Sequence, residues 1–221
     1  MTSPRALERD WTFYLTPQYG FDTSYDYRFA VAIDCEMGIS STGESELIRV
    51  TVVDYESGEV LLDSLVWPRA HMQHYNTPVT GITEKHMDDA LRSGAFLMYR
   101  EAARQAVWKF VGPDTIVCLH SGQNDLAALR WIHFNIIDTF LLEPVPVVTN
   151  ATTSSYMPAD KEQKRKQPKG SGPRSLKTLA RVKLGRDIQK RQHDSVEDAV
   201  ATKDLVHWAI INGLSKRVMS G

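Results

Sequence analysis

The chain has 221 residues, 42% of them hydrophobic and 24% charged, which is enough for one globular domain with a substantial core. It has neither an apolar run of the ~18–20 residues that a membrane helix needs nor the basic-then-apolar start of a signal peptide, so we expect no membrane partner. The net charge of −1 conceals an uneven distribution, because residues 161–191 hold 12 Lys and Arg and only two acids, which leaves −11 on the rest. An acidic body with one basic segment indicates either a polyanionic partner beside an acidic site or a solvated basic loop.

The first half of the chain predicts three consecutive strands after an irregular start. Residues 1–26 are aromatic and polar without periodicity, and we interpret them as an N-terminal segment that precedes a domain at 27–214. The apolar run at 28–36 predicts a buried strand, and the runs at 46–54 and 59–66 predict two more, joined by a turn. Residues 67–83 are punctuated by Pro and Gly and predict a loop.

In the second half, helices alternate with strands. We expect helices near 84–90 and 96–111, a strand at 115–120, a helix from Asn124 or Asp125, a strand at 134–139, and helices at 175–184 and from Ser195 onward. Residues 143–173 are rich in Pro, Ser, Thr and Lys and predict a basic, flexible insertion. Three strands followed by alternating elements predict an α/β fold, with a mixed five-stranded sheet whose first three strands are antiparallel and whose faces are covered by helices.

The two cysteines, Cys35 and Cys118, both fall in apolar strand-like runs. This placement argues against a disulfide framework and favours a reducing, intracellular compartment, either nucleus or cytoplasm. Side chains alternate along a strand, so Cys35 should point away from its neighbours Asp34 and Glu36 and be a buried small residue rather than a nucleophile.

The most informative stretch is "RFAVAIDCEMG", Arg28 to Gly38, where a buried strand ends in two acids. Asp34 and Glu36 are two positions apart, so their carboxylates leave the same face of the strand about 6–7 Å apart. Two like charges at the end of a buried element are costly unless a cation lies between them. The pattern therefore predicts a positive group at this point.

Two further acids have both a local and a functional interpretation. Asp198 shares a helix face with residues that should be buried, yet "SVED" also matches a capping box headed by Ser195. Asp125 follows the fourth predicted strand, where a negative charge at a helix start is favourable by itself. Taken together with Asp34 and Glu36, however, they make four hard oxygen ligands, which suit two Mg²⁺ or Mn²⁺ ions rather than structural zinc.

A histidine in "RQHDSVEDA" supplies the remaining chemical group. His193 lies five residues before Asp198, in the loop that enters the last helix. An imidazole that titrates near neutrality can take a proton from an attacking water, although a lone histidine before a helix is more often a surface residue.

At these residues the sequence resembles the DEDDh 3′-to-5′ exonuclease family, which has a ribonuclease-H-like fold. "AIDCEMG", "HSGQNDLAAL" and "HDSVEDA" resemble its three motifs, and "TPVTGIT" and "SLKTLARVKLGRDIQ" resemble its eukaryotic RNA exonuclease branch, which includes interferon-induced and ribosomal-RNA-processing enzymes. Leu119 departs from the pattern, because the resemblance leads us to expect Gly before His120.

The resemblance implies a role for each matching residue. The metal-site acids would be Asp34, Glu36, Asp125 and Asp198, with His193 as general base. Residues in contact with substrate or supporting it would be Met37, Gly38, Gly81, Ile82, Thr83, His120 and Asn124.

The resulting hypothesis is a divalent-metal-dependent exonuclease that shortens single-stranded RNA from its 3′ end and releases nucleoside 5′-monophosphates. The RNA preference rests on the resemblance alone, so a DNA exonuclease with the same site is one alternative, and a catalytically silent nucleic-acid-binding adaptor is another. The basic insertion could be an RNA-holding arm, a nuclear localisation signal or a linker. Monomer and homodimer both remain open.

Overall fold

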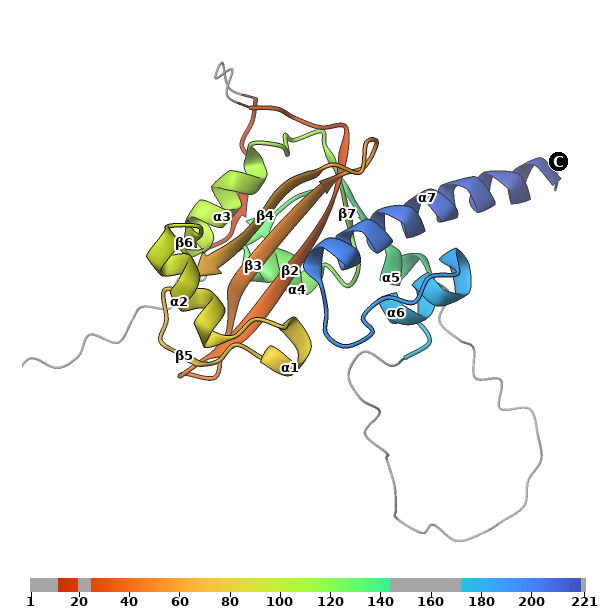
Figure 1. The fold of residues 1–221 in the computed structure, drawn as a ribbon. Helices are drawn as coiled ribbons and strands as arrows, with labels where there is room; N and C mark the ends of the chain where they lie inside the picture. The colour runs from red at the N-terminus through yellow and green to blue at the C-terminus, as the bar shows by residue number, and fades with distance from the viewer. Residues whose placement is uncertain (1–11, 20–24, 144–171, 220–221) are drawn as a thin grey trace, which may run out of the picture.

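The computed structural model describes residues 12–19, 25–143 and 172–219 (Figure 1). Its centre is a mixed sheet in the order β6-β4-β3-β2-β7-β9, with β5 paired to the end of β2. The strands are β2 (Ala30–Ser40), β3 (Ser45–Asp54), β4 (Val60–Trp67), β5 (Met72–His74), β6 (Leu97–Met98), β7 (Ile116–Leu119) and β9 (Ile136–Asp138). The predicted α/β class with a mixed sheet flanked by helices is confirmed.

The central strands of the sheet pair as predicted, and the sheet has additional strands that were not predicted. β2, β3 and β4 are antiparallel, whereas β7 lies parallel to β2 and β9 parallel to β7. The five predicted strands are all present, but the count of five is too low, because β5 and β6 make the sheet seven-stranded. These two strands are only three and two residues long, too short for a period-2 pattern to appear in the sequence.

Helices cover both faces of the sheet. They are α1 (Thr77–Thr80), α2 (Glu84–Ser93), α3 (Tyr99–Trp108), α4 (Gln123–Ala128), α5 (Thr139–Leu142), α6 (Leu176–Leu179), the π-helix η1 (Ala180–Leu184) and α7 (Ser195–Met219). The long α7 crosses one face and its C-terminal half extends past the sheet, while α3 and α4 lie on the other side (Figure 1). Among the described residues, none of the helices has the length and hydropathy that crossing a membrane requires.

The alternation of β2 divides the core into two layers. Val31, Ile33 and Cys35 belong to a cluster with residues of α3 and α4, such as Ala103 and Ala128. The intervening Ala32 belongs to a second cluster that includes Ala199 and Val206 of α7. Asp34 and Glu36 continue the series of Ala32, so the strand directs its two acids toward the side that α7 covers.

Two predicted irregular segments contain regular structure. In the N-terminal segment, β1 (Tyr14–Leu15) pairs in parallel with β8 (Trp131–Ile132), so residues 1–26 are not irregular throughout. In the predicted loop 67–83, β5 and α1 form. Both corrections concern very short elements, namely strands of two or three residues and a helix of one turn, which contact residues far away in the sequence. The basic insertion lies outside the described residues except for 143 and 172–173.

Candidate active site

The two acids of β2 lie at the end of the strand, beside the first turn of α7. Asp34 pairs with Thr51 of β3 and Glu36 with Arg49, and the register shifts directly after Glu36. Glu36 is 6% exposed despite its charge. The hydroxyl of Ser195, the first residue of α7, donates to the carbonyl of Asp34 (3.2 Å), which ties the start of the helix to the strand.

Asp125 reaches the same strand from α4. Its Oδ1 accepts a hydrogen bond from the backbone N–H of Cys35 (3.0 Å), between the two acids of β2. The side chain of Leu119 fills the space before this helix and is 1% exposed. A Cβ at Gly122 would lie 2.3 Å from Leu119, so the unexpected leucine is accommodated by a glycine three residues later.

Asp198 is the centre of a polar group at the start of α7. Its Oδ2 accepts from the Gln189 amide (2.8 Å) and lies 3.2 Å from Nδ1 of His193. Its Oδ1 is buried and has no partner among the described residues. The capping box is therefore wrong for Asp198, and the side chain of Asp194 caps the helix instead by accepting from the backbone of Val196 (3.0 Å).

The burial of these acids changes their protonation. Desolvation raises the pKa of Asp34 well above its ordinary value, and the charges of Asp125, Asp198 and Glu36 raise it further. Desolvation also raises the pKa of Glu36 to about 7 and that of Asp125 to about 7. The hydrogen bond with Asp198 raises the pKa of His193. The site thus strongly favours any positive charge brought to it.

One cleft of about 580 Å³ reaches two of the four acids, whereas Glu36 and Asp125 are not in its lining. Its lining includes Asp34, Asp198, His193 and Gln189, together with His120 and Asn124, two residues that the sequence placed near the substrate. His120 is held by Thr139, whose hydroxyl lies 2.8 Å from Nδ1. Sequence reasoning missed Gln189, because an amide nine residues before Asp198 gives no local signal.

The donor set fits divalent cations. The four carboxylates supply hard oxygen atoms, which Mg²⁺ and Mn²⁺ prefer, and the unpartnered Oδ1 of Asp198 is a buried acceptor that a cation would satisfy. In the described residues, no three His, Cys, Asp or Glu side chains already converge as a ready-made metal site. The reason is visible in their contacts, since Asp125 turns to the Cys35 amide and Asp198 to Gln189 and His193.

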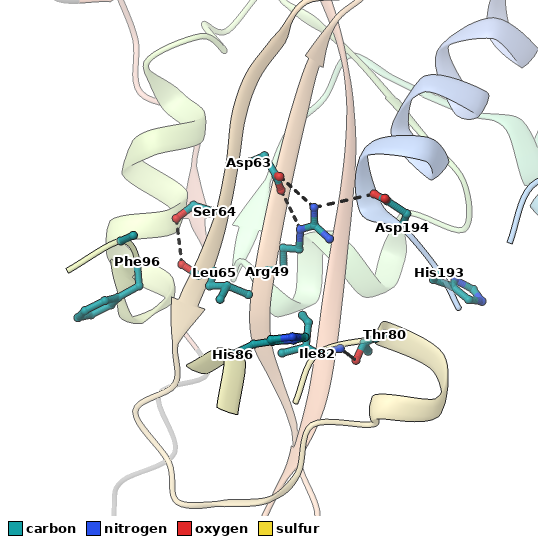
Figure 2. A pocket seen from close by; sticks show the side chains of 12 residues that line it. Arg49, Asp63, Ser64, Leu65, Thr80, Ile82, His86, Phe96, His193 and Asp194 are labelled. Carbon is teal, nitrogen blue, oxygen red and sulfur yellow. Dashed lines mark hydrogen bonds and ion pairs between the residues drawn. The ribbon is translucent and has the colours of Figure 1, made fainter. Parts of the chain in front are cut away.

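A second cavity, of about 570 Å³, shares His193 with the first cleft (Figure 2). Gly81 and Ile82 line it, and the backbone N–H of His193 donates to the carbonyl of Val79 (2.8 Å), so this loop and the His193 loop are in contact. Arg49 also lines the cavity, where its guanidinium donates to Asp63 at 2.8 and 2.9 Å and lies 3.9 Å from Asp194. The charge of Arg49 is thereby largely compensated.

Three expected substrate-contacting residues also have structural roles. The Thr83 hydroxyl caps α2 by accepting from His86 N (3.2 Å). A Cβ at Gly38 would lie 2.6 Å from Met72 and 2.9 Å from the carbonyl of His74, so β5 can approach only a glycine. Met37 is half-buried against the main core.

Curated proteins that resemble this chain include RNA exonucleases from fungi. RNA exonuclease 3 of Yarrowia lipolytica is 37% identical over 179 residues, which are 80% of this chain and 20% of the relative. RNA exonuclease 1 of Saccharomyces cerevisiae is 32% identical, over 83% of this chain and 28% of its own length. RNA exonuclease 4 of Candida glabrata is 35% identical, over 78% and 56%. The chain thus spans between a fifth and just over half of these relatives.

Solved structures with the same fold include those of Pan2. The Neurospora crassa Pan2 catalytic unit, which holds protease and nuclease domains, matches with a TM-score of 0.64 and 20% identity, over 95% of this chain and 32% of that one. A Saccharomyces cerevisiae Pan2 exonuclease module in complex with AAGGAA RNA matches with a TM-score of 0.63 and 21% identity, over 87% and 30%. At this identity the likeness concerns the fold. No family model matches the chain.

Proposed function

Because this chain belongs to the DEDD family of exonucleases with a ribonuclease-H-like fold, we propose that it hydrolyses single-stranded RNA from the 3′ end in a reaction that depends on divalent cations. The observation that carries the proposal is the gathering of Asp34, Glu36, Asp125 and Asp198 from three elements beside His193, with Oδ1 of Asp198 buried and unpartnered. The names of the curated relatives support RNA as the substrate, and RNA is bound in the Pan2 structure.

The four acids would hold two divalent cations, Mg²⁺ or Mn²⁺. When bound, such ions supply a Lewis acid that stabilises charge on a phosphodiester and eases loss of a proton from water. The two oxygens of Asp198 would have different roles. Oδ2 contacts Gln189 and His193, whereas Oδ1 is left for a cation.

His193 is the general base in this proposal. Its Nδ1 contacts Asp198, so the other ring nitrogen remains to accept a proton from the attacking water, and the carboxylate stabilises the imidazolium that forms. The oxygen of that water forms a bond to phosphorus while the bond to the 3′-oxygen of the preceding ribose breaks. The products are a nucleoside 5′-monophosphate and an RNA one residue shorter.

We also propose an intracellular location, since both cysteines are buried and unpaired, as proteins in reducing compartments commonly have them. The division into an N-terminal segment and a domain at 27–214 stays a prediction.

The test uses two oligomers of one sequence, RNA and DNA, labelled at the 5′ end and incubated with Mg²⁺, Mn²⁺ or EDTA. The expected result is a ladder that shortens from the 3′ end of RNA, disappears in EDTA and is lost in Asp34→Ala. Asp88→Ala, which removes an exposed acid of α2, is the matched control and should behave as wild type. Faster DNA cleavage would assign the DNA exonuclease alternative, and RNA binding without cleavage in any cation would assign the adaptor.

A further inference from the structure

The cleft that Asp34 and Asp198 line also has one arginine in its lining. Arg174, just before α6, lines the cleft together with Asp34, Asp198 and His193. Its guanidinium lies 3.9 Å from the centroid of the Phe140 ring, and its Nε donates to the Phe140 carbonyl (3.1 Å), as does Nη2. These described contacts are with a ring and a carbonyl, neither of which is an anion, so the positive charge of Arg174 remains available to a ligand.

The residues around Arg174 hold it in place. Phe140 lies edge-on to His120, with ring centroids 5.9 Å apart. Asp138 binds three backbone N–H groups at 2.9 Å each, those of Ser121, Gly122 and Phe140, and so fixes the turn before α4 to α5. The ring and the guanidinium are therefore held in place before a ligand arrives, so binding to them costs little conformational entropy.

This arrangement suits one unit of a nucleic acid strand. A guanidinium provides charge-assisted hydrogen bonds to a phosphate, and guanidinium and aromatic planes are the surfaces on which unpaired bases stack. Asp34 and Asp198 line the same cleft as Arg174, so a phosphodiester placed at these two acids puts a neighbouring nucleotide within the cleft. The second cavity is lined by His193, Gly81 and Ile82, and because the resemblance places the last two in contact with substrate, this cavity is the natural place for the terminal nucleotide.

We propose that Arg174 and Phe140 form a subsite for the nucleotide that precedes the scissile linkage, with Arg174 binding the phosphate of the second linkage from the 3′ end and the Arg174–Phe140 surface stacking on the base. This subsite rests on the proposed exonuclease function and adds to it the part of the substrate that the chain holds during each step.

The competing explanation is purely structural, because Arg174 could serve only to tie the start of α6 to α5. Loss of Arg174 would then reduce activity and stability whatever the substrate. A phosphate contact differs in one respect, since its loss is felt only when that phosphate carries a charge. A cycle that combines a protein substitution with a neutral linkage in the RNA separates the two explanations.

The experiment measures kcat/KM for release of the 3′-terminal nucleotide in Mg²⁺. The two substrates are an RNA octamer and the same octamer with a neutral methylphosphonate at the second linkage. We expect Arg174→Gln to lower kcat/KM for the charged substrate about tenfold, mainly through KM. The methylphosphonate should lower kcat/KM of wild type by a similar factor. It should lower kcat/KM of Arg174→Gln by less than about twofold. Arg181→Gln removes an equal charge from the exposed surface of η1 and should respond to the methylphosphonate as wild type does.

A parallel cycle tests the base contact. Phe140→Leu is combined with an RNA that lacks the base of the second nucleotide, and the two losses should overlap in the same way. Phe134→Leu, at a ring that is 81% exposed, is the control. Thermal unfolding identifies any variant that fails to fold.

Additive losses in the first cycle overturn the phosphate contact, as does coupling of Arg174 to the first linkage instead of the second. If wild type shortens RNA from the 3′ end and the cycles are additive, only the subsite is wrong. If wild type neither cleaves nor binds RNA, the proposed function and the subsite are both wrong.

Discussion

Raising the pH should lower the free energy of unfolding of the cation-free protein, and part of this decrease should come from Glu36. Burial raises the pKa of Glu36 from its ordinary 4.5 to about 7, so between these values the folded chain retains a proton that the unfolded chain has lost. Stability therefore falls as the pH rises through this window and is constant above it. At about 1.4 kcal/mol per pKa unit, the loss from Glu36 is about 3 kcal/mol. The pKa of Asp125 is also about 7, and the two acids act in the same direction.

Glu36→Gln isolates this contribution, because glutamine imitates the protonated acid at every pH. Thermal unfolding of wild type and Glu36→Gln in EDTA should give similar Tm values at pH 5. At pH 8 the variant should unfold about 6–12 °C higher, since 1 kcal/mol corresponds to about 2–4 °C for a chain of this size. Burial lowers the pKa of His120 and His133, which gives stability the opposite trend below pH 6.5, but that trend cancels in the difference.

The control is Glu56→Gln, at an exposed acid in the turn between β3 and β4, whose difference from wild type should not change with pH. Adding Mg²⁺ at pH 8 should stabilise wild type more than Glu36→Gln. An equal gap between wild type and Glu36→Gln at pH 5 and pH 8 would refute the argument that burial and repulsion strain this site.

Three further results are expected. His193→Ala should lower kcat by about 10²–10⁴-fold and remove the acidic limb of the pH–rate profile, whereas a retained limb would place the base elsewhere. Gln189→Ala should lower activity and the affinity for divalent cations, each about tenfold or more, because Asp198 loses the amide that orients it. Calorimetric titration with Mn²⁺ measures this affinity, and an unchanged value would contradict the role of Gln189. Deleting residues 150–170 should leave kcat intact but flatten the salt dependence of RNA binding, and an unchanged salt slope would reduce that segment to a linker.

Much of the fold could be predicted from local patterns. The apolar run before Asp34 predicted β2, and the period of two correctly turned Cys35 into one core layer and the acids toward the other. The short strands could not be predicted in this way. β1 exists because Tyr14 and Leu15 pair with residues 131–132, more than a hundred positions later. A stretch of two residues carries no sequence pattern from which such a pairing could be predicted.

The site divides in the same manner. The sequence by itself determined which residue types were available, where each stood on its strand or helix, and the family whose motifs they match. Only the tertiary structure decided that Asp125 contacts the strand 90 positions away, that Asp198 has one satisfied and one unsatisfied oxygen, and that Gln189 and Arg174 face the same cleft. Periodicity reflects steric rules within a few residues, whereas these contacts arise when distant segments pack against the two faces and ends of one sheet.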